Sequence, residues 1–252
     1  MPGPSTDPPK YLAEHLDELR QRLMRCLVVA GFGMAAAFIK SNWLFEALLR
    51  PFRQVQGKFP EFAQQVHTLQ TLSPIEAFMI NMKLATLAGL ILASPLFLRE
   101  AWAFSAPALK TNEKGAIFTI FCLGLFFFGG GLAFGYFIII PLALQFLVQY
   151  NLAYHFIPQW TLQGYFSFVV NFLMVFGLLF ELPLVLAALA SIGVATPAFL
   201  AQKRKHAILA VFILAFFVAP SADPISQTLV ALPLIFLYEV GIWMSYLAVR
   251  KN

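Results

Sequence analysis

Six long apolar runs, separated by short polar segments, dominate the pattern of the chain. Each run is predicted to form a membrane-spanning helix. The predicted spans cover about residues 23–39, 75–98, 116–140, 165–192, 206–219 and 225–248. They form one domain over residues 10–250, after a Pro- and Ser-containing segment, residues 1–9, that is expected to be disordered. The pattern therefore predicts an all-α polytopic membrane protein, whose fifth span is short for a bilayer core of about 30 Å.

The polar segments between these runs also carry local predictions. Leucines spaced four, three and four residues apart in residues 12–23 predict an amphipathic helix at the membrane surface, on which Glu18 and Arg22 are spaced to pair. The longest connection, residues 40–73, is expected to contain a short interfacial helix that stops at Pro51. Gly131 and Gly135 are spaced to form a close helix contact.

Glu76 opens the second predicted span. A carboxylate in the first turn is explained by capping of the helix N-terminus. Lys83, seven residues further on the same face, is placed either to pair with Glu76 or to extend its amine towards the membrane surface.

Composition and charge agree with a membrane protein. Of the 252 residues, 60% are hydrophobic, 28 are Phe and only 12% are charged. The net charge of +5 comes from short basic clusters between the apolar runs, so it indicates topology and not nucleic-acid binding. Four of the polar segments carry most of the Lys and Arg and place both termini in the cytoplasm. The first loop, with Lys40, Arg50, Arg53 and Lys58, is the exception.

Catalytic chemistry has little support in the sequence. The four histidines lie in separate elements, and the chain has no HExxH, P-loop or GxSxG motif. Cys26 and Cys122 fall inside apolar runs without a CxxC spacing and are interpreted as small buried hydrophobic residues. The chain is predicted not to be an enzyme, and neither a metal nor a cofactor is expected.

Glu181 is the one acid between Gly115 and Gln202, a stretch that contains no Lys or Arg. A carboxylate inside a membrane helix raises the free energy of insertion by about 3 kcal/mol. Such a residue is therefore treated as a candidate functional residue by default. Pro183 follows two residues later and removes the helical donor to the Leu179 carbonyl. One interpretation is a proton- or ion-coupled small-solute transporter with Glu181 as the coupling acid. The absence of a convincing internal repeat weighs against it.

Five motifs in order favour a different interpretation: HLDELRQRL at 15–23, SPIEAF at 73–78, WAFSAPALKTNEK at 102–114, FELPLVL at 180–186 and PSADPISQTLVALPLIFLYEVG at 220–241. Together they resemble the TatC family, the core receptor subunit of the twin-arginine protein translocase. The similarity extends over residues 10–247. It implies six spans in a concave, glove-like arrangement with both termini cytoplasmic.

The resemblance also implies sites, which fall into three groups. A signal-peptide site at the cytoplasmic face would be formed by Glu18, Arg20, Phe104 and Glu113. Intramembrane polar positions for docking of partner helices would be Glu181, Gln227 and Glu239. Structural positions on the periplasmic side would be Pro51 and Asp223. Carboxylates fit two consecutive arginines because they accept bidentate hydrogen bonds from guanidinium groups.

The implied partners follow from the same resemblance. They are the single-span proteins TatA and TatB, the twin-arginine signal peptides of folded cargo, the lipid bilayer, and further copies of the chain in a homo-oligomeric receptor complex. Transport would draw on the proton motive force without nucleotide. The implied location is the bacterial cytoplasmic membrane, or its archaeal or organellar equivalent.

Overall fold

The computed structural model describes residues 12–105, 114–156, 158–191, 193–218 and 224–250, and these residues are almost entirely helical, which confirms the all-α prediction. The predicted disordered segment, residues 1–9, lies outside them. The elements are α1 (Leu12–Ile39), α2 (Ser41–Lys58), α3 (Pro60–Gln65), α4 (Glu76–Ser105), α5 (Lys114–Phe134), the π-helical turn η2 (Gly135–Ile139), α6 (Ile140–Ala153), α7 (Leu162–Leu179), α8 (Leu182–Ser191), α9 (Pro197–Gln202), α10 (Arg204–Val218) and α11 (Pro224–Arg250).

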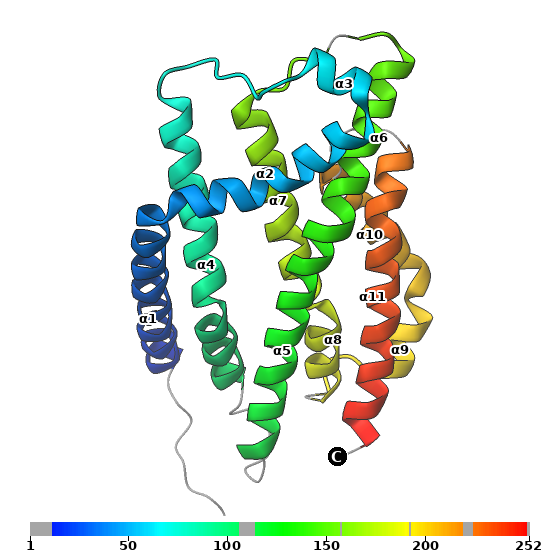
Figure 1. Ribbon diagram of the computed structural model, residues 1–252. Coiled ribbons are helices and arrows are strands. Elements are labelled where there is room, and N and C mark those ends of the chain that lie inside the picture. The colour runs from blue at the N-terminus through cyan, green and yellow to red at the C-terminus, as the bar shows by residue number, and fades with distance from the viewer. Residues whose placement is uncertain (1–11, 106–113, 157, 192, 219–223, 251–252) are drawn as a thin grey trace, which may run out of the picture.

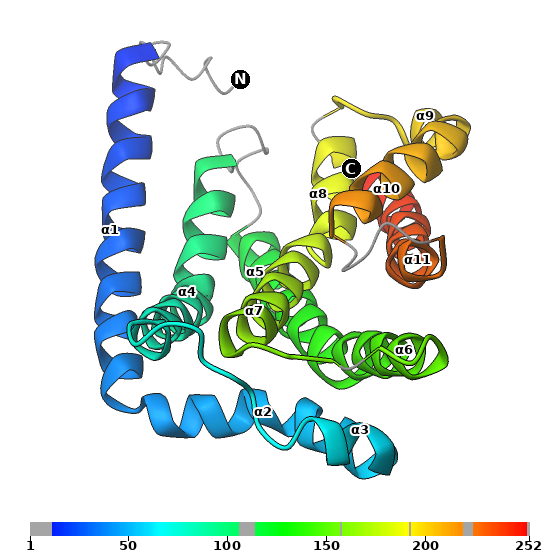
Figure 2. The same cartoon turned by 90° about the horizontal axis from the view of Figure 1, so that it is seen from above.

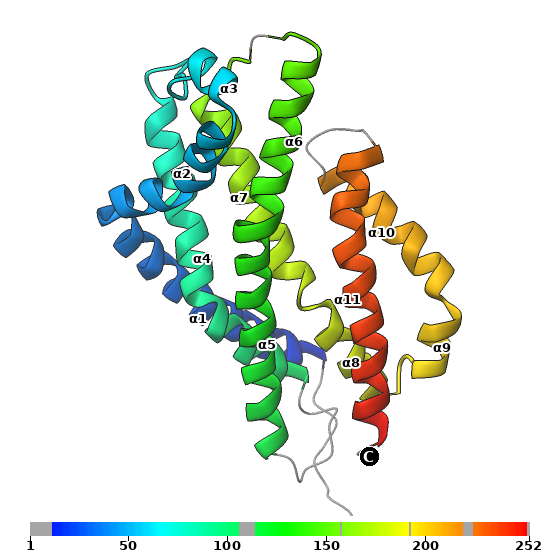
Figure 3. The ribbon, with the colours of Figure 1, turned by 45° about the vertical axis from the view of Figure 1, so that its right-hand side comes forward.

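The helices form an open, curved wall and not a closed bundle (Figures 1 and 2). Helix α1 lies along one edge of the wall beside α4, and α2 runs across the end of α1 (Figure 2). Helices α10 and α11 lie side by side at the other edge (Figure 3). We call the end where α1 begins and α11 ends the terminal end, and the opposite end, which holds α2, α3 and the start of α7, the cap end.

Five segments of the described chain are long and apolar enough to cross a membrane: Leu19–Ile39, Glu76–Glu100, Phe121–Ala153, Leu162–Ser191 and Val230–Val249. The predicted fifth span corresponds to α10, which has 15 residues and is shorter than all of these. A crossing by α10, and with it a count of six spans, stays a prediction.

The third predicted span continues beyond its expected end near residue 140. Helix α5 passes through η2 into α6, which extends to Ala153. Pro141 has no N–H to donate, and the wider π turn lies directly before it, with the Ile140 N–H donating to the Gly135 carbonyl. The helix therefore passes the proline without ending.

Glycines mark the closest helix contacts. A Cβ on Gly131 of α5 would meet the Phe176 carbonyl oxygen of α7, and a Cβ on Gly135 would lie 3.3 Å from the Phe176 Cβ. The predicted small-residue contact face is thus confirmed. At a second crossing, a Cβ on Gly89 of α4 would come within 2.6 Å of the Ala30 carbonyl oxygen of α1. Side chains larger than hydrogen do not fit at Gly131 and Gly89 without a shift of the facing backbone, and the contact at Gly135 is tight.

The cap end has an aromatic core. Phe52 of α2, Phe62 of α3, and Trp160 and Tyr165 at the start of α7 contact one another with ring centroids 4.9 to 6.2 Å apart. The chain before α4 also pairs with the chain before α7, because the Gln70 N–H donates to the Trp160 carbonyl at 3.0 Å. The longest connection is therefore packed structure and not a free loop.

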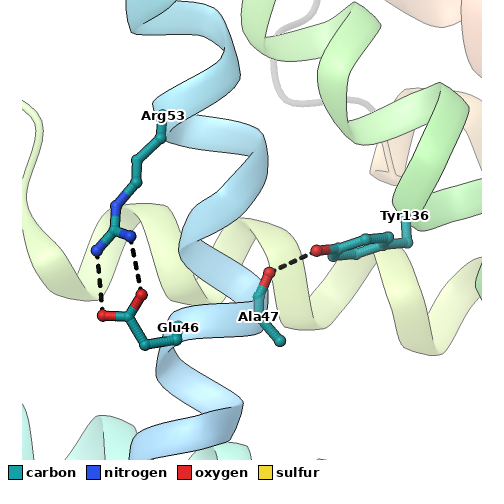
Figure 4. A network of polar contacts seen from close by, with 4 residues as sticks. All are labelled: Glu46, Ala47, Arg53 and Tyr136. Carbon is teal, nitrogen blue, oxygen red and sulfur yellow. Dashed lines mark hydrogen bonds and ion pairs between the residues drawn. The ribbon is translucent and has the colours of Figure 1, made fainter.

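Pro51 does not end the interfacial helix, so the prediction that the helix stops there is wrong. Helix α2 continues through Pro51 to Lys58, with Pro51 buried. Proline cannot donate to the carbonyl four residues earlier, that of Ala47. The Tyr136 hydroxyl donates to this oxygen instead (Figure 4). On the outer face of α2, Arg53 donates to both carboxylate oxygens of Glu46, at 2.8 and 3.1 Å (Figure 4).

Candidate functional site

An ion pair joins α1 to α4 near the terminal end. The Arg22 Nη1 donates to Glu100 Oε2 at 2.7 Å, with 19% of the Arg22 side chain and 10% of the Glu100 side chain exposed. Cys26, one helical turn after Arg22, is buried as predicted, whereas Cys122 of α5 is exposed, so the prediction is wrong for that residue. The sequence suggested Glu18 as a partner of Arg22 and did not suggest Glu100, which lies 78 residues away in the chain.

The structure brings together the two helices that carry the predicted signal-peptide residues. Glu18 lies on α1 four residues before Arg22, and Phe104 lies on α4 four residues after Glu100. Because α1 and α4 are antiparallel, both backbone positions fall on the terminal side of the ion pair. Arg20 of α1 is exposed. Glu113 lies outside the described residues.

Glu181 lies at an interruption of the fourth predicted span. Helix α7 ends at Leu179 and α8 begins at Leu182, as Pro183 requires of the backbone before it. The side chain is half-buried, and its Oε1 is buried without a hydrogen-bond partner among the described residues. A Cβ on Gly124 of α5 would lie 3.5 Å from Glu181 Oε2. The carboxylate therefore lies against α5 at this position.

The other predicted docking positions differ from Glu181. Glu239 of α11 pairs with Arg204, the first residue of α10, through two contacts of 2.8 and 2.9 Å. Its charge is therefore compensated within the chain. Gln227 is half-buried near the start of α11, and Asp223 lies outside the part of the chain that the structure describes.

Glu76 does more than the predicted capping. Its Oε2 accepts from the N–H groups of Leu72 and Ser73 at 2.7 and 3.4 Å, just before α4. Its Oε1 accepts from the Gln163 N–H in the first turn of α7 at 2.6 Å. One buried carboxylate thus holds two helix N-termini together at the cap end. Lys83 does not pair with it and donates to Ser167 of α7 at 2.9 Å.

Three contacts were missed by the sequence analysis and share one property: Arg22 with Glu100, Tyr136 with Ala47, and Glu76 with Gln163. Each contact joins positions 78 to 89 residues apart in the chain. The only sequence signals were a carboxylate at a predicted helix end and a proline within a predicted helix. Among the described residues, no three His, Cys, Asp or Glu side chains gather in a group that could hold a metal ion.

These features define a multi-pass membrane protein that is built from helices over the described residues and has a packed cap end. The sequence matches the family described as "Sec-independent protein translocase protein (TatC)" over residues 14–233. The chain belongs to the TatC family.

Named relatives agree over nearly the whole length. A Sec-independent protein translocase protein TatC of Aquifex aeolicus is 38% identical over 242 residues, which are 96% of this chain and 97% of the relative. A protein of the same name from Carboxydothermus hydrogenoformans is 36% identical over 239 residues, 95% of this chain and 94% of the relative. A crystal structure described as the twin arginine translocase receptor TatC superimposes with a TM-score of 0.79 at 37% identity, covering 93% of this chain and 99% of that one.

The names describe a translocase component and receptor, in agreement with the prediction that the chain is not an enzyme. These names argue against the interpretation of the chain as a small-solute transporter with Glu181 as the coupling acid.

Proposed function

We propose that the chain is the signal-peptide receptor and assembly platform of a twin-arginine translocase. It binds Arg-Arg signal peptides at the terminal end, which faces the cytoplasm, and recruits TatA and TatB to export folded proteins with the proton motive force. The supporting observation is that α1 and α4, which carry Glu18, Arg20 and Phe104, are joined at that end by the Arg22–Glu100 pair. The solved structure with the matching fold is described as a twin-arginine translocase receptor.

Charge complementarity supports an arginine ligand. In the proposal, Glu18 and Glu113 supply the carboxylates and Phe104 supplies an apolar contact for the segment after the arginines. A carboxylate accepts two parallel hydrogen bonds from a guanidinium, whereas a lysine ammonium offers only a point charge. Arg20 would position the carboxylates by attraction and exclude nearby cations that lack this geometry.

The proposed orientation rests on both ends of the fold. Helix α1 begins and α11 ends at the same end, which supports an even number of crossings with α10 as the sixth span. Lys203 lies between α9 and α10, and Arg204 and Lys205 open α10, which is consistent with a cytoplasmic segment. The location would be a bacterial cytoplasmic membrane.

For partner docking, Glu181 is the strongest of the intramembrane candidates. Its Oε1 lacks a hydrogen-bond partner in the described chain, and a buried carboxylate oxygen gains free energy from any donor that reaches it. A polar side chain on a single-span partner helix could donate there. Glu239 is a weaker candidate because Arg204 already pairs with it. Further copies of the chain would assemble in the same receptor complex.

A photo-crosslinking experiment tests the receptor proposal. A photoreactive residue is placed at Phe104 of the full-length protein in lipid nanodiscs, and two signal peptides are added that differ only in Arg-Arg against Lys-Lys. We expect strong labelling by the Arg-Arg peptide and about tenfold weaker labelling by the other, the scale of one charge-assisted hydrogen bond. Glu113→Ala should abolish the difference while membrane insertion is kept. Equal labelling of the two peptides by the unmodified protein contradicts the proposal.

A further inference from the structure

We infer that Arg22 is an internal competitor for the arginine site. The Arg22 guanidinium pairs with the Glu100 carboxylate until an arginine of the ligand takes the place of Arg22. Glu100 is then a further carboxylate of the site, exposed to the ligand only by this exchange. The inference rests on the proposed function, because the ligand is an Arg-Arg peptide.

The position of the pair favours this role. Arg22 follows Glu18 by four residues on α1, and Glu100 precedes Phe104 by four on α4, so the pair lies about 6 Å further from the terminal end along each helix axis. A peptide bound against those two positions reaches the pair next as its side chains extend into the bundle. The pair is also open on one side, because 19% of the Arg22 side chain remains accessible.

The burial of Glu100 explains why it becomes available to a ligand only when one guanidinium replaces another. Glu100 is buried, and removal of its partner alone would leave an uncompensated buried charge, which is strongly unfavourable. Replacement of one guanidinium by another avoids that cost, since the carboxylate is paired before and after. A lysine gives a weaker, single-point contact and displaces Arg22 less readily.

The energetic consequence is a lowered affinity. When the peptide binds, it gains a contact with Glu100, but the contact between Arg22 and Glu100 is lost. The wild-type protein therefore binds its peptide less tightly than a protein in which the Glu100 carboxylate is unpaired. This keeps binding reversible. If Arg22 is removed, an arginine ligand gains the whole contact with Glu100, and a lysine ligand gains a smaller one.

A purely structural pair predicts the opposite. If Arg22 and Glu100 only fasten α1 to α4, loss of Arg22 loosens the two helices and weakens peptide binding or leaves it unchanged. The glycine crossing at Gly89, where a Cβ would come within 2.6 Å of the Ala30 carbonyl, already holds α1 against α4 deeper in the membrane. The pair is therefore not the only contact between these two helices.

The test measures equilibrium binding of fluorescent Arg-Arg and Lys-Lys signal peptides to the full-length chain in nanodiscs. The variants are Arg22→Gln, Arg22→Lys, Glu100→Gln and the double variant R22Q/E100Q. Arg25→Gln is the control for the loss of one positive charge, because Arg25 is exposed on α1 three residues further on. Arg204→Gln is the control for the loss of an ion pair between helices, because Arg204 pairs with Glu239.

We expect Arg22→Gln to tighten binding of the Arg-Arg peptide about tenfold, the scale of one charge-assisted hydrogen bond, and that of the Lys-Lys peptide less. Arg22→Lys should show a smaller gain, and the double variant should lose the gain. The controls should change binding by about twofold or less, as for exposed charges.

Two results would overturn the inference: unchanged or weaker binding by both Arg22 variants, or a gain that persists without Glu100. If the wild-type protein does not prefer Arg-Arg to Lys-Lys, the proposed function itself fails. If it does prefer Arg-Arg and R22Q binds no tighter, only the competition by Arg22 is wrong.

Discussion

Single polar atoms in this fold compensate backbone groups that prolines and helix ends leave without partners. The Tyr136 hydroxyl donates to the carbonyl of Ala47, because Pro51 has no N–H to donate to it. The Glu76 carboxylate accepts from N–H groups at the starts of α4 and α7. The contacts of Tyr136 with Ala47 and of Glu76 with Gln163 link segments far apart in the chain, so one substitution affects two elements at once.

Tyr136→Phe removes the donor to the Ala47 carbonyl and leaves that oxygen without its side-chain partner. We expect a loss of about 1 to 2 kcal/mol in the free energy of unfolding, as for a buried carbonyl that loses a hydrogen bond. Unfolding by denaturant in detergent micelles measures it. Tyr150→Phe is the matched control, since Tyr150 is exposed on the following helix. An equal change in both variants would show that the hydroxyl bond to Ala47 does not stabilise α2.

Glu181→Ala tests the separation of docking from peptide binding. Glu181 lies at the junction of α7 and α8 and not on α1 or α4, so we expect the Arg-Arg peptide to bind with unchanged affinity while crosslinking to single-span partners decreases. The measurement pairs peptide binding with site-specific crosslinking at α8. If peptide binding falls as much as partner crosslinking, the role proposed for Glu181 is wrong.

At the scale of elements, glycine positions decide how closely helices approach. Gly131 and Gly129 lie two residues apart on α5 and have opposite surroundings: a Cβ at Gly131 would meet the Phe176 carbonyl, and a Cβ at Gly129 would meet nothing within 4 Å. The contrast offers a test in which helix propensity is the same for both substitutions.

Gly131→Ala should separate α5 from α7 and lower the free energy of unfolding by about 1 to 3 kcal/mol, as overpacking does. Gly129→Ala should be neutral or raise it by up to about 1 kcal/mol, because alanine favours the helix. Thermal unfolding of both variants in nanodiscs measures the difference. Equal stabilities would mean that the α5–α7 contact relaxes without cost.

The helices themselves were predictable from the sequence because apolar periodicity is a local signal. The spans near α1, α4, α7–α8 and α11 appear where the pattern placed them. The extent of α2 was not predictable, since whether a helix continues through Pro51 depends on a hydroxyl 89 residues further along the chain. In the candidate site, Glu18 and Phe104 came from motifs, but the pairing of Arg22 with Glu100 came only from the fold. Contacts between distant segments leave no periodic pattern to read.

For the whole molecule, the proposed topology makes a direct prediction about accessibility. Single cysteines are introduced in a background with Cys26 and Cys122 replaced by Ala, at exposed Gln54 on the cap end and at Lys203 between α9 and α10. A maleimide that cannot cross the membrane should label position 54 in intact cells and position 203 only after permeabilisation. Labelling of position 203 from outside would contradict the cytoplasmic placement of the terminal end.

The unequal lengths of the helices have a consequence for the lipid around the protein. The continuous apolar stretch Phe121–Ala153 has 33 residues and is about 50 Å long, whereas α10 has 15 residues and is about 22 Å long. A hydrocarbon layer of about 30 Å matches neither, so acyl chains must stretch or tilt beside one flank and compress beside the other. If α10 crosses the membrane as proposed, the lipids along it are held in an elastically strained, thinner annulus. A membrane with shorter acyl chains should lower that strain and favour the protein's insertion.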